Sequence, residues 1–122
     1  MSKFTNKKFT GSLKHAIKGI LACFKSQRNF KYQFGIFVLI CLVSFLFKYS
    51  VVETCLCIFT IMLVMIVEML NSCMEFALDA VYRNKYSILV KISKDILAGA
   101  VLLSSLSCVI INSLIFFSKF FK

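Results

Sequence analysis

Three long apolar runs decide what this chain can fold into. They cover residues 32–47, 51–68 and 96–118, and only the second contains acidic residues. About 20 apolar residues span the hydrocarbon core of a bilayer, and somewhat fewer suffice between polar flanks. Hydrophobic residues make up 60% of the 122-residue chain and the mean hydropathy is +0.88, far above an ordinary soluble domain. The sequence therefore predicts an all-α integral membrane protein, a single domain over residues 1–122, with spans at about 30–47, 51–81 and 95–118.

The basic residues predict the orientation, because Lys and Arg in short loops mark the cytoplasmic side of a membrane protein. Of the 15 basic residues, only Lys48, Lys119 and Lys122 lie on the side opposite the N-terminus. We therefore expect a cytoplasmic N-terminus and an outside C-terminus. The net charge is +10. The basic residues that carry it flank the apolar runs and do not interleave with aromatic residues, which favours anionic lipid headgroups over nucleic acid as a partner.

A basic amphipathic helix is predicted at about residues 8–26. Apolar residues recur there at helical spacing, while Lys14, Lys18 and Lys25 fall mostly on the other face. Such a helix lies on the inner leaflet of a membrane. Two roles stay open for it: a membrane anchor, or a lid over a site that faces the lipid.

A polar stripe marks the second apolar run. Glu68, Asn71, Glu75 and Asp79 are separated by three, four and four residues, which places them on one helix face. A carboxylate inside a membrane helix costs roughly 2.5–3.5 kcal/mol on insertion scales, so an acid in this position indicates a functional site. Glu68 could act as a general base while Glu75 holds a divalent cation.

A structural interpretation of the same acids stays open, in which they pair with Lys94, Arg83 or Lys91 to close the helix bundle. No glycine-rich phosphate loop or kinase catalytic-loop motif is present, since the four glycines are isolated. The six cysteines form no CxxC pair and are interpreted as small apolar packing residues.

Several segments resemble the prokaryotic diacylglycerol kinase family, which also includes undecaprenol kinases. They are MLVMIVEMLNSCMEFALD at 62–79, SKDILAGAV at 93–101, HAIKG at 15–19 and RNF at 28–30. The resemblance implies a small homotrimeric enzyme of the bacterial cytoplasmic membrane, with active sites shared between subunits. Such an enzyme transfers the γ-phosphoryl group of ATP, with Mg²⁺ as cofactor, to a lipid hydroxyl at the inner membrane face.

The resemblance also implies a role for individual positions. Glu68 matches the general base, Glu75 a magnesium ligand, and Lys94 with Asp95 a pair that contacts the nucleotide. The implied contacts to the lipid substrate are Glu68, Asn71, Arg28 and Asn29. The implied contacts to the nucleotide are Lys8, His15, Gln27, Glu75, Lys85, Tyr86, Ser87, Lys94 and Asp95, with His15 standing where the family has a tyrosine.

One position departs from the family pattern. The family usually has a glutamate before RNF as a second metal ligand, and this chain has Gln27 there. An amide oxygen can bind magnesium but brings no charge, so Glu75 and Gln27 would form a weaker metal site or leave the enzyme impaired.

Two lipids stay open as the substrate, diacylglycerol and undecaprenol. The run MLVMIVEMLNS is similar to diacylglycerol enzymes, whereas RNF and AGAVLLSSLSCVII are similar to undecaprenol kinases. We favour diacylglycerol, which would give phosphatidic acid. A small proton-coupled transporter, which also depends on a membrane-embedded glutamate, is the alternative from another class.

Overall fold

Four helices build the chain in the computed structural model, which describes residues 2–83 and 87–121 and the side chains from residue 8 on. They are α1 (Ser2–Ser26), α2 (Arg28–Leu46), α3 (Val51–Tyr82) and α4 (Ile88–Phe120). The last three are long and apolar enough to cross a membrane. The predicted all-helical architecture with three such helices is therefore confirmed.

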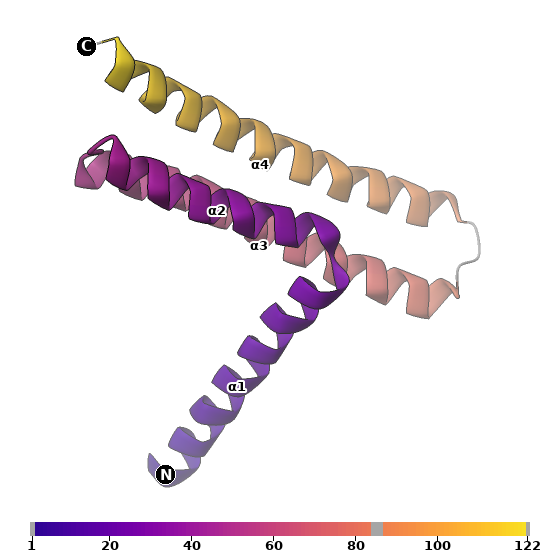
Figure 1. The fold of residues 1–122 in the computed structure, drawn as a ribbon. Coiled ribbons are helices and arrows are strands. Elements are labelled where there is room, and N and C mark those ends of the chain that lie inside the picture. Colours follow the sequence, from indigo (N-terminus) through magenta and orange to yellow (C-terminus); the bar gives the residue numbers. More distant parts are fainter. Residues whose placement is uncertain (1, 84–86, 122) are drawn as a thin grey trace.

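The three apolar helices lie side by side, and α1 projects away from them at a steep angle (Figure 1). The chain reverses between α2 and α3 over residues 47–50, so these two helices run antiparallel. α4 returns along α3 and ends near the α2–α3 turn. α4 packs mainly on α3 and meets α2 through side chains near the α2–α3 turn, such as Phe47 with Phe116, while much of its surface stays uncovered.

The core lies where α2, α3 and α4 meet in the half of the bundle near the α2–α3 turn. Its buried apolar members are Ile40, Cys57, Ile61, Val64 and Cys108. Buried hydroxyl groups in these helices donate to a carbonyl three or four residues earlier, as Ser44 does to Ile40 O at 2.7 Å and Thr60 to Cys57 O at 2.7 Å. These hydrogen bonds satisfy polar groups without water, as a membrane interior requires.

One amide links α4 to α3 inside this core. Asn112 Nδ2 donates to Thr60 Oγ1 at 3.1 Å and to the Cys108 carbonyl oxygen at 2.8 Å. Hydrogen bonds between helices hold membrane bundles together because apolar side chains gain little by leaving lipid for one another. The Asn112 contact therefore sets the register of α4 on α3.

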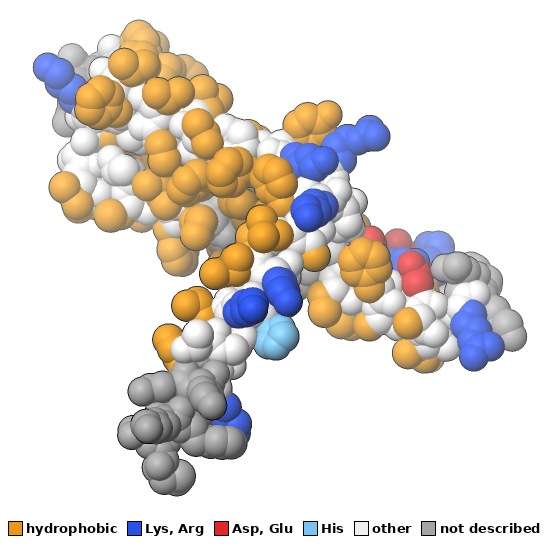
Figure 2. All heavy atoms as spheres, turned by 60° about the horizontal axis from the view of Figure 1, so that its bottom comes forward, with side chains coloured by type: hydrophobic (Ala, Val, Ile, Leu, Met, Phe, Trp, Pro, Cys, Tyr) orange, Lys and Arg blue, Asp and Glu red, His pale blue; other side chains and the backbone are white. Residues whose placement is uncertain are grey.

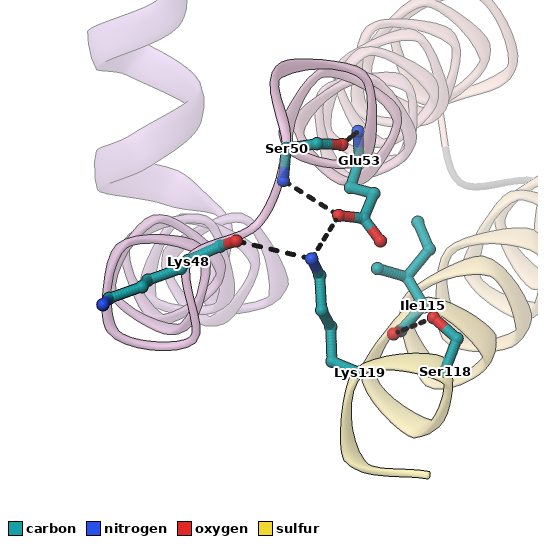
Figure 3. A network of polar contacts seen from close by, with 6 residues as sticks. All are labelled: Lys48, Ser50, Glu53, Ile115, Ser118 and Lys119. Carbon is teal, nitrogen blue, oxygen red and sulfur yellow. Dashed lines mark hydrogen bonds and ion pairs between the residues drawn. The ribbon is translucent and has the colours of Figure 1, made fainter. Parts of the chain in front are cut away.

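A cluster of polar contacts lies at the end of the bundle opposite the α3–α4 connection (Figure 3). We call it the clamp, and its members are Lys48, Ser50, Glu53 and Lys119. Ser50 caps α3: its hydroxyl accepts from Glu53 N at 3.2 Å, and its own N–H donates to Glu53 Oε1 at 2.8 Å. Lys119 from α4 forms an ion pair with Glu53 at 2.9 Å and donates to the Lys48 carbonyl oxygen at 3.4 Å. The clamp thus joins the start of α3, the end of α4 and the turn before α3.

We predict that Ser50→Ala lowers the free energy of unfolding by about 1 kcal/mol, because it removes the helix cap of α3. Denaturant unfolding in detergent micelles, followed by circular dichroism, measures the change. Ser118→Ala is the matched control, since the Ser118 hydroxyl bonds only to Ile115 O of its own helix, at 2.8 Å. Equal destabilisation by both substitutions would contradict the role assigned to the cap.

Candidate active site

The polar stripe of α3 begins at a buried carboxylate. Glu68 is 2% exposed, whereas Asn71, Glu75 and Asp79 are half-buried. The four residues occupy successive turns of one unbroken helix toward the α3–α4 connection. The stripe therefore runs from an enclosed layer of the bundle to an open one.

Helix α1 covers the buried end of the stripe. Burial raises the pKa of the Cys23 thiol on α1, a hydrogen bond with the Ser72 side chain lowers it, and the charge of Glu68 raises it. Cys23 also lines a hollow together with Met69 and Ser72, so it lies against the part of α3 that carries Glu68. Among the described residues, the Glu68 carboxylate takes part in none of the ion pairs.

A wholly apolar cavity of about 540 Å³ opens between α1, α2 and α3. Met65 and Met69, which flank Glu68 in the sequence, both line it. The other lining residues are Ile20, Leu21, Phe24, Phe30, Phe34, Phe37, Met62 and Ile66. A second hollow of about 320 Å³ lies between α1 and α3, and Cys23, Met69 and Ser72 are among its lining residues. Apolar space thus adjoins the turns of α3 on either side of Glu68, and a lipid chain is the ligand chemistry that such a lining accepts.

Two ion pairs lie near the α3–α4 connection. Lys94 Nζ is 3.0 Å from Asp79 Oδ1, which joins α4 to α3, and Lys91 Nζ is 3.0 Å from Asp95 Oδ2 on α4 itself. These side chains are between 40% and 65% exposed, so water screens both pairs. The structural interpretation of the acids thus holds for Asp79, while Glu68 and Glu75 make no ion pair within the described chain.

The other residues singled out in the sequence are spread over three helices. Lys8 and His15 are exposed on α1, and Arg28 and Asn29 are exposed in the first turn of α2. Gln27 is half-buried before α2, where its side chain makes no capping hydrogen bond. Ser87 immediately precedes α4. Lys85 and Tyr86 lie outside the described residues.

Figure 2 shows how side chains are distributed on α1. Hydrophobic side chains follow one edge of this helix, and basic side chains with the lone histidine follow the other (Figure 2). Phe9, Leu13, Ile17, Ile20 and Leu21 are all between 46% and 70% exposed. Acidic and basic side chains also gather together beyond α1, toward the end of α3 (Figure 2).

The described part of the chain contains no group of three His, Cys, Asp or Glu side chains that could hold a metal ion. A magnesium ion needs fewer protein ligands, because it keeps several waters and is usually bound through one or two carboxylates and the phosphates of its substrate. The half-buried Glu75 carboxylate and the Gln27 amide oxygen are hard oxygen donors of this kind. The donor chemistry therefore fits a magnesium ion that arrives with a nucleotide.

Cys23 and Gln33 are two residues of this region that the sequence alone did not mark for function. Cys23 was interpreted as a packing residue, and only the docking of α1 on α3 brings it to Glu68. Gln33 is a buried amide in an otherwise apolar helix. The signal that could have marked Gln33 is the presence of an amide inside an apolar run of the sequence.

The fold and this site define a small multi-pass helical membrane protein with a buried carboxylate beside an apolar cavity. A model of the family described as prokaryotic diacylglycerol kinase matches residues 14–116. The chain belongs to this family of lipid kinases.

Two relatives illustrate the range of the family. A diacylglycerol kinase from Synechocystis sp. is 34% identical over 101 residues, which are 83% of this chain and 58% of that protein. The chain thus spans little more than half the length of this relative. An undecaprenol kinase from Bacillus subtilis is 30% identical over 112 residues, which are 92% of this chain and 90% of that protein.

We predict that Cys23 reacts much more slowly with a water-soluble maleimide than Cys73 does. Thiolate is the reactive form, and burial raises the pKa of the Cys23 thiol. Cys73 is exposed and lines the same hollow between α1 and α3, so it is the matched control. The two rates are measured at neutral pH on variants that retain one cysteine each. Equal rates would mean that α1 does not cover this part of α3.

Proposed function

We propose that this chain is an ATP-dependent kinase that phosphorylates diacylglycerol to phosphatidic acid at the inner face of a bacterial membrane. The observation that carries the proposal is the Glu68 carboxylate, buried beside a wholly apolar cavity between α1, α2 and α3. Membership of a lipid kinase family supports phosphoryl transfer as the reaction. It favours a kinase over the proton-coupled transporter that a buried glutamate also suggested.

Glu68 is the general base in this proposal. The apolar cavity takes the acyl chains, and the lipid hydroxyl reaches the carboxylate with Asn71, Arg28 and Asn29 near the headgroup. The hydroxyl oxygen forms a bond to the γ-phosphorus, the bond from that phosphorus to the β,γ-bridging oxygen breaks, and ADP leaves with its electron pair. The hydroxyl proton passes to a Glu68 carboxylate oxygen. A carboxylate is suited to this step where it lies within hydrogen-bond reach of the proton that it takes.

The nucleotide binds from the cytoplasmic side in this proposal. Lys94 contacts its phosphates, where a positive charge offsets the charge spread over the γ-phosphoryl oxygens. Asp95, Ser87, Lys85 and Tyr86 complete the site from α4 and the segment before it, and Lys8 and His15 contribute from α1. Glu75 and Gln27 would hold the Mg²⁺ ion, which supplies further charge neutralisation to the phosphates when bound.

The assembly proposed is a homotrimer with shared sites. The exposed surface of α4 supports it, because α4 packs mainly on α3 within one chain and exposes large apolar side chains such as Leu102, Leu103 and Val109. Lipid covers part of this surface, and neighbouring subunits cover the rest. The basic edge of α1 would rest on anionic headgroups of the inner leaflet, with the N-terminus cytoplasmic and the C-terminus outside.

Undecaprenol is the second candidate substrate. The observation in its favour is that the match to the undecaprenol kinase covers 90% of that protein, against 58% for the diacylglycerol kinase. An assay of purified protein in mixed micelles with labelled ATP and each lipid alcohol in turn decides between the two. Faster phosphorylation of undecaprenol at equal mole fraction would replace diacylglycerol in the proposal.

We predict that Glu68→Gln lowers turnover by about 10²–10⁴, the usual contribution of a general base, with the KM for ATP little changed. The substitution keeps the shape of the side chain and removes its basicity. Glu53→Gln, which changes a carboxylate at the other end of α3, is the control and keeps most of the activity. A Glu68→Gln enzyme that is correctly assembled and retains more than about a tenth of wild-type turnover would rule out Glu68 as the base.

We also predict that Lys94→Met lowers kcat/KM for ATP by about 10–100-fold, the usual effect of losing a hydrogen bond to a charged group. Methionine keeps an aliphatic stem and removes the charge. Asp79→Asn is the control, since it breaks the Lys94–Asp79 ion pair but leaves the lysine in place. If both variants lose activity and stability to the same extent, Lys94 serves the α3–α4 contact and not the nucleotide.

A further inference from the structure

One buried amide in α2, that of Gln33, has an oxygen without a hydrogen-bond partner. Gln33 is 9% exposed, and its Oε1 atom has no hydrogen-bond partner; no other buried side-chain nitrogen or oxygen among the described residues is left in this way. Buried hydroxyl groups elsewhere are paired, as Ser72 donates to Glu68 O at 3.0 Å and Ser104 to Val101 O at 2.9 Å. An unpaired acceptor buried in a membrane helix opposes folding. Its presence therefore calls for a functional reason.

The packing of α2 on α3 puts Gln33 within about a turn of Glu68 along the bundle. Phe37 packs against the core cluster, whose last member on α3 is Val64. Gln33 lies one turn before Phe37, and Glu68 lies one turn after Val64. Because the two helices run antiparallel, these steps go in the same direction along the bundle.

The apolar cavity supports this placement independently. Phe30, Phe34 and Phe37, which surround Gln33 on α2, line the cavity together with Met65 and Met69, which surround Glu68 on α3. The cavity thus meets both helices at this level. Gln33 Oε1 is a buried acceptor without a donor, and the Glu68 carboxylate takes part in no ion pair among the described residues.

We propose that Gln33 is a positioning residue for Glu68, whose acid form donates a hydrogen bond to Gln33 Oε1. The inference rests on the proposed function, in which the lipid O–H bond breaks and its proton passes to one Glu68 oxygen as the new O–P bond forms. The resulting carboxylic acid has one O–H group to donate, and the unpaired amide oxygen receives it. The proton stays on Glu68 until the phosphorylated lipid leaves.

A glutamine suits both protonation states of the base. Rotation of its terminal amide exchanges Oε1 for Nε2, so the same side chain can donate to the carboxylate before the transfer and accept from the acid afterwards. A base that is oriented by a second hydrogen-bonding group keeps its geometry through the reaction. Gln33 therefore supplies on α2 the partner that Glu68 lacks on α3 and α1.

Gln33→Met tests the inference, because methionine has a similar length and no hydrogen bond to offer. We expect turnover to fall about tenfold, the KM for ATP to stay unchanged, and the melting temperature in micelles to stay equal or rise, since the unpaired amide is gone. Gln33→Leu is the second variant if methionine packs badly. Ser44→Ala is the control: Ser44 is a buried polar residue on the same face of α2, its hydroxyl is paired, and turnover per folded enzyme should not change.

A double-mutant cycle separates action through Glu68 from a general effect. In the Glu68→Gln background, Gln33→Met should lower the residual turnover less than about twofold. An equal tenfold loss in both backgrounds would overturn the inference, as would a loss of stability that accounts for the lost activity. Wild-type protein that phosphorylates neither lipid alcohol would instead refute the proposed function, and the inference with it. If the wild type is active and both Gln33 variants match it, the inference alone fails.

Discussion

The lack of water in the hydrocarbon core is the constraint on which the structure depends. Backbone groups there must bond within their own segment, which is why α2, α3 and α4 are long helices without interruption. The same constraint acts on side chains: hydroxyl groups donate to carbonyls of their own helix, and Asn112 bonds to Thr60 and Cys108. Against this pattern, the Gln33 amide oxygen stands out as a buried atom without a partner, and Glu68 as a buried carboxylate without an ion pair among the described residues.

Helix α1 forms one wall of the candidate site around the buried Glu68. Without it, the apolar cavity would lack the wall formed by Ile20, Leu21 and Phe24. With α1 in place, the carboxylate has apolar space on the membrane side and the charged end of α3 on the other. Of the two roles that the sequence left open for this helix, a cover is the one that the hollows between α1 and α3 favour.

Helices could be read from the sequence because hydrophobicity and helical period are local properties, and the absence of proline and the spacing of glycines allowed α3 to continue to Tyr82. The contacts between helices could not be predicted from the sequence, because they depend on how each helix is rotated about its axis. Lys94 and Asp95 are neighbours in sequence, yet one pairs with Asp79 on α3 and the other with Lys91 on α4. Likewise, the sequence shows that Gln33 lies in an apolar run but not that its oxygen is unpaired.

The length of α3 has a mechanical consequence. Its 32 residues extend about 48 Å at 1.5 Å per residue, whereas the hydrocarbon core is about 30 Å thick. One continuous helix therefore carries the stripe from the buried Glu68 to the exposed ion pair at Asp79, and each residue inserted or deleted between them would rotate one part of the stripe by about 100° relative to the other. Substitutions in this segment can tune the proposed chemistry, but a change in its length would uncouple the proposed lipid half of the site from the proposed nucleotide half.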